Sequence, residues 1–98
     1  MDFSFEGEVI YWRGPAPFLF VALPPATGAE IAALGSAVSY GWVCVPVLAR
    51  IGAVEFSTSL FPRNGSYVLP LKVAARKALP PMDVGDRLVV HMTIVPRR

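Results

Sequence analysis

Cysteine, histidine and long apolar runs are all scarce in this sequence. The chain of 98 residues contains one cysteine, Cys44, and one histidine, His91. A lone cysteine cannot form an internal disulfide bond, and the pair is too small a ligand set for a zinc site. The apolar run 18–23 stops at Pro24 and Pro25, well short of the roughly 18 residues that span a membrane. No disulfide, metal, cofactor or membrane helix is therefore predicted.

Charged residues are also few, at 16%, whereas 54% of the residues are hydrophobic, which excludes a disordered chain. The net charge of +2 is unevenly distributed: residues 1–49 carry −3 and residues 50–98 carry +5. Such a difference attracts acidic partners only if the basic residues share one face. Asp2 stands where a secretory signal would be positive, so we expect a cytoplasmic protein.

The length predicts one domain over residues 1–98, and the spacing of apolar residues predicts a mainly β fold with two short helices. Period-two alternation and short apolar runs indicate the strands, and apolar residues three or four apart indicate the helices. The expected strands cover residues 3–11, 18–23, 40–49, 54–60, 66–69 and 87–95, and the expected helices cover 29–34 and 71–79.

Prolines and one glycine modify these elements. A bulge is expected at Gly7, where the alternation of the first strand slips by one residue. Pro46 removes a hydrogen-bond donor from its strand, which favours an edge or bulged position. Pro70 is expected in the first turn of the second helix, where no N–H bond is lost, and Pro80 and Pro81 should end that helix early.

The remaining glycines predict tight turns at residues 51–53, 62–65 and 84–86, and the second of these turns contains an Asn-Gly pair. The second helix should have a basic side and an apolar side. Its basic residues are Lys72, Arg76 and Lys77, and its apolar residues are Leu71, Ala75, Ala78 and Leu79. In the last strand, one face should carry Leu88, Val90, Met92 and Ile94.

The two halves of the chain resemble each other. Leu23-Pro24 and Leu69-Pro70 each join a strand to a helix, and a glycine precedes a valine-rich strand in both halves, at Gly41 and Gly85. This repeat predicts a pseudo-twofold barrel in which each half supplies a strand-helix-strand unit.

Six short blocks together resemble the bacterial domain-of-unknown-function family numbered nineteen hundred and five. They are Trp12-Arg13-Gly14, Leu23-Pro24, residues 40–47, residues 58–62, residues 67–72 followed by Arg76-Lys77, and Val84-Gly85-Asp86. The resemblance covers nearly the whole chain. It implies a small double-split β-barrel similar to the AbrB-like swapped-hairpin barrels, and it leaves the activity open.

We interpret the chain as a non-enzymatic binding or interaction module for a small ligand or a protein partner, either as a monomer or as a weak homodimer. Aromatic side chains offer contact surface, and arginines offer directional donors. The candidate ligand-binding residues are Trp12, Arg13, Tyr40, Trp42, Phe61, Arg63 and Arg76. For the aromatic residues, ordinary core packing is the competing interpretation.

Two alternatives remain open. A nucleic-acid-binding, AbrB-like regulator would need its basic residues on one face, and those candidates are Arg63, Lys72, Arg76, Lys77 and Arg87. An enzyme of unknown reaction would have to use Cys44 or His91. The hydroxyls of residues 57–59 lack the motif of a serine hydrolase, and Asp83 and Asp86 are better explained as turn residues. No catalytic residue is predicted.

Overall fold

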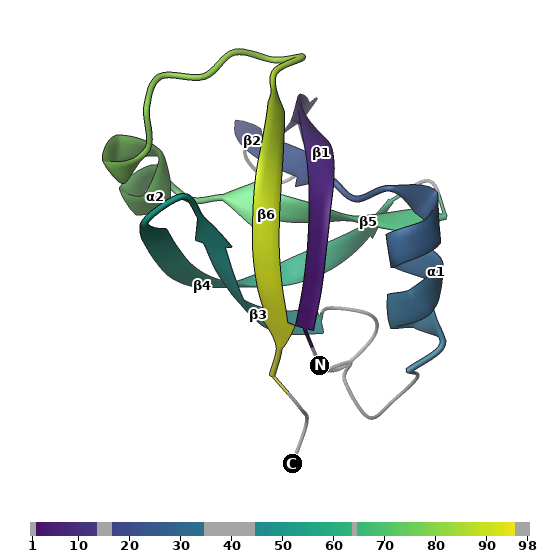
Figure 1. Cartoon of the computed structure of the whole chain (residues 1–98). Helices are drawn as coiled ribbons and strands as arrows, with labels where there is room; N and C mark the ends of the chain where they lie inside the picture. The colour runs from purple at the N-terminus through teal and green to yellow at the C-terminus, as the bar shows by residue number, and fades with distance from the viewer. Residues whose placement is uncertain (1, 14–16, 35–44, 64, 96–98) are drawn as a thin grey trace.

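The computed structural model describes residues 2–13, 17–34, 45–63 and 65–95. Within them, six antiparallel strands form a closed barrel flanked by two short helices, which confirms the expected mainly β fold (Figure 1). The elements in chain order are β1 (Asp2–Arg13), β2 (Pro17–Ala22), α1 (Pro25–Ala32), β3 (Val45–Ile51), β4 (Val54–Arg63), β5 (Ser66–Leu71), α2 (Val73–Ala78) and β6 (Arg87–Ile94). Around the barrel the order is β1-β2-β5-β4-β3-β6.

The barrel interior is filled by alternate residues of the strands, as period-two alternation requires. The inward residues of β6 are those expected: Leu88 is partly buried, and Val90, Met92 and Ile94 are buried. Ile31 from α1 and Leu79 after α2 complete this core. Each fully buried large apolar side chain contributes about 1.5–3 kcal/mol, so the interior supplies most of the stability.

The pseudo-twofold repeat is visible in the topology. If the half β1-β2-α1-β3 is exchanged with the half β4-β5-α2-β6, neighbouring strands stay neighbours: β1–β2 maps onto β4–β5, β3–β4 maps onto β1–β6, and β2–β5 and β3–β6 map onto themselves. Each half contributes a hairpin, a helix and a further strand. The two halves are interleaved, because β2 pairs with β5 and β3 pairs with β6.

The structure changes the alignment of this repeat. Leu23 directly precedes the N-cap residue of α1, and Leu71 directly precedes the N-cap residue of α2. The counterpart of Leu23 is therefore Leu71, whereas the two Leu-Pro pairs in the sequence suggested Leu69. Gly41 lies outside the described residues, so its expected equivalence to Gly85 stays a prediction.

The bulge expected at Gly7 is wrong. Strand β1 pairs with β6 from Asp2 to Glu8 without a break in register, and it pairs with β2 from Glu8 onward. Gly7 is buried on the inward face, where an added Cβ would meet the carbonyl oxygen of Ala22. The apolar alternation is interrupted there because a side chain does not fit. Tyr11 near the end of the same strand is exposed.

The expected position of Pro70 is also wrong. Pro70 lies inside β5, opposite Phe20 of β2, and is buried. The helix begins three residues later, at Val73, and ends at Ala78 before Pro80. Of the residues expected on the apolar side, Leu71, Ala75 and Leu79 are buried, but Ala78, the last residue of the helix, is exposed.

Helix α1 begins at Pro25, four residues earlier than expected, since proline is well suited to the first helical position. Its Gly28 crosses β5 so closely that an added Cβ would meet Ser66. The Ser66 hydroxyl donates to the Leu23 carbonyl oxygen at 3.2 Å and lies 3.4 Å from that of Pro24. Ser66 thus ties the start of α1 to the barrel.

Replacing Ser66 with alanine should lower the free energy of unfolding by about 1 kcal/mol, because the part-buried hydrogen bond to Leu23 is lost. Urea denaturation followed by circular dichroism measures the change. Ser57→Ala, at an exposed position of β4, is the matched control and should leave the midpoint nearly unchanged. Equal midpoints for the two variants would contradict the anchoring role.

The other expected boundaries need smaller corrections. Strand β4 runs to Arg63, so Pro62 belongs to the strand and pairs with Tyr67. Strand β3 has neighbours on both sides, and Pro46 pairs with Ser59 in an unbroken register, so both the edge and the bulged position expected for Pro46 are wrong. The Pro46 carbonyl accepts from the Val95 N–H at 3.0 Å. None of the helices among the described residues is long and apolar enough to cross a membrane.

Candidate functional site

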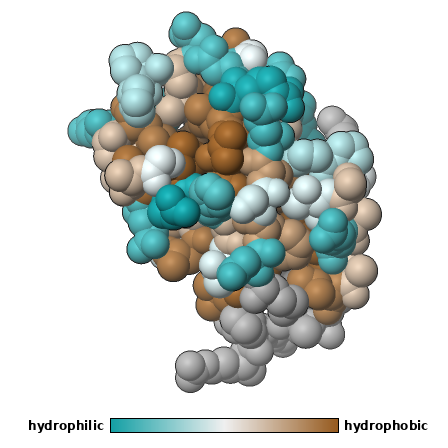
Figure 2. Space-filling view, in the orientation of Figure 1, coloured by the Kyte–Doolittle hydropathy of each residue, from teal (hydrophilic) through white to brown (hydrophobic). Residues whose placement is uncertain are grey.

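A hollow of about 570 Å³ lies at one end of the barrel, beneath the connection from α2 to β6. We call it the apolar hollow. Three segments line it: the β3–β4 hairpin (residues 51–54), the end of α2 with the chain that follows (residues 78–82), and the start of β6 (residues 86–88). In Figure 2, hydrophobic residues gather between the positions of α2 and β6.

Local sequence explains this shape. Gly52 has φ +60°, which allows β3 and β4 to be joined by a two-residue turn. Pro80 and Pro81 cannot continue α2, so the chain leaves the helix and passes over the barrel end. Gly85, with φ +100°, then turns the chain into β6. The expected turns at 51–53 and 84–86 therefore lie on the rim of one hollow.

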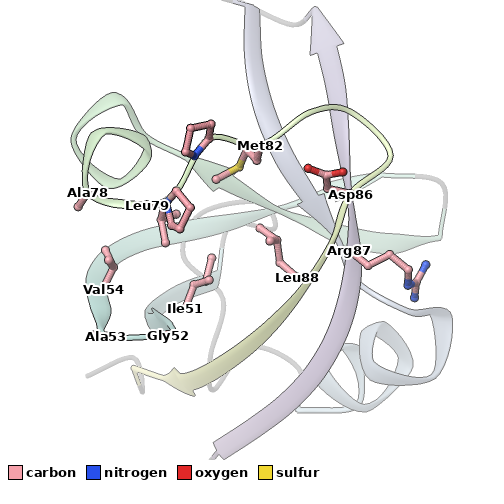
Figure 3. A pocket seen from close by; sticks show the side chains of 12 residues that line it. Ile51, Gly52, Ala53, Val54, Ala78, Leu79, Met82, Asp86, Arg87 and Leu88 are labelled. Atoms are coloured by element: carbon pink, nitrogen blue, oxygen red, sulfur yellow. The ribbon is translucent and has the colours of Figure 1, made fainter.

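The polar groups near the apolar hollow have partners outside it. The Asp86 carboxylate accepts from the Asp83 N–H at 2.9 Å, as expected for a turn residue. The Arg87 Nε donates to Glu6 Oε1 at 2.9 Å, and Figure 3 shows the Arg87 side chain pointing away from Ile51, Leu79 and Leu88. The surface left for a ligand is mainly apolar.

A second hollow, of about 520 Å³, lies at the other end of α2. We call it the Lys72 hollow. It is lined by Ser57, Thr58, Ser59 and Phe61 of β4, with Pro70 of β5 and Lys72. The two hollows share no lining residue. Helix α2 therefore separates an apolar hollow from one that combines hydroxyls, an ammonium and an aromatic ring.

The structure brings together only part of the predicted ligand-binding set. Phe61 is 39% exposed in the Lys72 hollow. Arg63, two residues further along β4, borders a small hollow of about 170 Å³ beside the start of α1. Arg76 is half-buried on α2. The backbones of Trp12 and Arg13 end β1.

Several predicted residues cannot be placed. The structure describes the backbone but not the side chains of Trp12 and Arg13. Tyr40, Trp42 and Cys44 lie outside the described residues. Their proposed roles stay predictions.

The basic residues considered for nucleic acid fall into separate places. Lys72, Arg76 and Lys77 lie together at α2. Arg63 pairs with Ser66 at the opposite end of β5, roughly 20 Å from Lys72 at the usual rise per strand residue. Figure 1 shows α1 and α2 on opposite sides of the barrel. Arg87 is held by Glu6.

A row of polar residues that crosses four strands of the barrel was not predicted from the sequence. Ser4, His91, Arg50 and Glu55 stand opposite one another on four adjacent strands. A hydrogen bond of 2.7 Å joins Ser4 Oγ to His91 Nδ1. These residues border a polar hollow of about 320 Å³. Only the strand register reveals the row, because Ser4 and His91 are 87 residues apart in the chain.

Comparison with known proteins supplies one match. A family model described as a domain of unknown function, DUF1905, matches residues 5–92. No curated protein matches the chain, and neither does any solved structure. The expected likeness to AbrB-like barrels therefore stays a prediction.

Proposed function

Because the chain belongs to the DUF1905 family of domains of unknown function, only its own geometry can indicate an activity, and we propose that it is a non-enzymatic domain that binds a small apolar ligand in the apolar hollow. The observation that carries this proposal is the hollow itself. Its volume of about 570 Å³ is in the range of small-molecule sites.

The side chains of the hollow support an apolar ligand. Ile51 and Leu79 are buried at its base, and Val54, Met82 and Leu88 are partly buried around it. Figure 3 shows these side chains converging from the hairpin, the α2–β6 connection and β6. A thioether such as that of Met82 adapts to ligands of different shape. A ligand that covers this surface gains a free energy of about 25 cal/mol for each Å² of apolar area that it removes from water.

The connection over the hollow is suited to admitting a ligand. Residues 79–83 form no helix or strand, and Pro80 and Pro81 are exposed. At the far end the chain is held more firmly: Asp83 and Asp86 share a side-chain and a backbone hydrogen bond, and residues 85 and 86 each form a backbone hydrogen bond with Val9 of β1. Ligand entry therefore requires no break in the barrel pairing.

An uncharged environment-sensitive dye such as Nile red tests the proposal. We expect its fluorescence to rise on titration with the protein. Ala78→Phe should weaken binding about tenfold, because the added ring prevents the dye from burying apolar surface equal to roughly two methylene groups. Ala78 is exposed and lines the hollow. Ala74→Phe is the matched control, since Ala74 is exposed on the same helix but lies outside the lining.

A second blocking variant, Ala53→Trp, narrows the hollow from the opposite hairpin and should weaken binding as Ala78→Phe does. Circular dichroism of each variant checks that the barrel is intact. If Ala74→Phe weakens dye binding as much as Ala78→Phe does, the dye binds outside the apolar hollow and the proposal is overturned. So would the absence of any fluorescence change with the folded protein.

A further inference from the structure

The Lys72 hollow has a chemistry unlike that of the apolar hollow. Ser57 and Ser59 lie on the outer face of β4, and the exposed Lys72 ammonium stands at the start of α2. Hydroxyls donate to oxygen acceptors, and an ammonium adds a positive charge with three donors. Of the charged residues that the structure describes, Lys72 alone lines this hollow, so the hollow favours an anion.

A second cation, Arg76, lies one helical turn beyond Lys72, next to the residues that line the hollow. The Arg76 N–H donates to the Lys72 carbonyl oxygen at 2.9 Å, so the two side chains leave α2 from successive turns on one side. Helix α2 packs against β4, the strand that carries the hydroxyls. Among the described residues, Arg76 Nε is the buried side-chain donor without a partner. Native proteins seldom leave such a donor unsatisfied, so an acceptor that reaches the Arg76 guanidinium would gain a favourable hydrogen bond.

Phe61 supplies the third part of the hollow. Its ring is 39% exposed and lies two positions beyond Ser59 on the same face of β4. An exposed ring beside a cationic group can stack on a flat aromatic ligand while the cation holds an attached anion. The buried Pro70 forms the adjoining wall on β5.

We propose that the Lys72 hollow binds a small phosphorylated aromatic compound of the nucleoside monophosphate type. The phosphate lies between Lys72, the Arg76 guanidinium and the hydroxyls of Ser57 and Ser59, and the base stacks on Phe61. A volume of about 520 Å³ is ample for such a ligand. The site is independent of the apolar hollow, because the two have no lining residue in common.

The test is titration of the full chain with AMP at low salt, followed by NMR of the backbone amides. Shifts should concentrate at residues 57–61 and 72–76. Lys72→Gln should weaken AMP binding about tenfold, since a charge-assisted contact is lost. Lys77→Gln is the matched control: it removes the same charge from the same helix, but Lys77 is exposed, outside the lining, and does not follow Lys72 by one helical turn as Arg76 does, so affinity should change less than about twofold.

Two further variants separate the parts of the ligand. Phe61→Leu should weaken AMP binding while leaving the affinity for inorganic phosphate unchanged, because only the base contacts the ring. Arg76→Lys keeps the charge but removes the Nε donor, and should weaken AMP and inorganic phosphate alike. Adenosine alone should bind more weakly than AMP in every variant.

Three results would overturn the proposal. The first is no AMP binding to the folded protein at low salt. The second is an equal loss of affinity in Lys72→Gln and Lys77→Gln, which would mean diffuse attraction to the helix. The third is tighter binding per nucleotide to single-stranded DNA than to AMP together with sensitivity to Lys77→Gln, which would indicate an extended backbone-binding surface. Failure here leaves the dye-binding prediction for the apolar hollow intact.

Discussion

Replacing Gly7 with alanine should lower the free energy of unfolding by about 3 kcal/mol, the upper part of the usual range for overpacking. The added Cβ would meet the carbonyl oxygen of Ala22 and lie 2.6 Å from a methyl carbon of Val21. A side-chain methyl can rotate, but the Ala22 carbonyl is part of the backbone of the β1–β2 ladder, in which Ala22 pairs with Glu8. The strands must separate locally to make room, and pairing is weakened. Urea denaturation measures the loss.

Gly52→Ala is the matched control for this prediction. Gly52 also requires glycine, but for its φ of +60°, and nothing lies within 4 Å of an added Cβ. The left-handed conformation costs about 1–2 kcal/mol in a residue with a side chain. We therefore expect a smaller loss than at Gly7. A Gly7→Ala protein as stable as the parent would show that β1 and β2 can move apart freely, contrary to the structure.

Leu69→Ala should remove about 2–5 kcal/mol of stability, which is a large part of the 5–15 kcal/mol typical of a folded domain. Leu69 is completely buried in the barrel core, where it sits on β5 opposite Val21. Truncation leaves a cavity surrounded by strands that the closed barrel holds in place. The unfolding midpoint in urea, or the Tm, records the change.

Leu48→Ala removes the same atoms from the outer face of β3, where Leu48 is 38% exposed, and should cost less than about 1 kcal/mol. If Leu69→Ala does not fold, Ile94→Val gives a milder test, with an expected loss of about 1 kcal/mol at a buried position. Similar losses for Leu69→Ala and Leu48→Ala would contradict the assignment of inside and outside faces.

Local sequence patterns predicted the elements better than their ends. Strand β6 was predicted to within one residue because Leu88, Val90, Met92 and Ile94 alternate without interruption. Pro70 misled the prediction, because local sequence does not distinguish a proline at the start of a helix from a proline at a buried strand position. Its place in β5 is determined by pairing with Phe20, 50 positions earlier in the chain.

The candidate sites depended on such distant pairing still more strongly. The apolar hollow joins residues 51–54 to residues 78–88, and no local motif connects these segments. The basic side of α2 was predicted, but not the hydroxyls of β4 that adjoin it. Sequence reasoning identifies residue types that can bind a ligand, whereas the barrel register determines which of them meet.

The closure of the barrel has a consequence for synthesis of the chain. Strand β6 pairs with β1 on one side and with β3 on the other, and Asp2 of β1 stands opposite Thr93 of β6. Until the ribosome has delivered β6, the nascent chain exposes two unpaired strand edges. Open edges pair readily with other chains. A folding intermediate that lacks β6 is therefore more prone to pair with other chains than the closed barrel is.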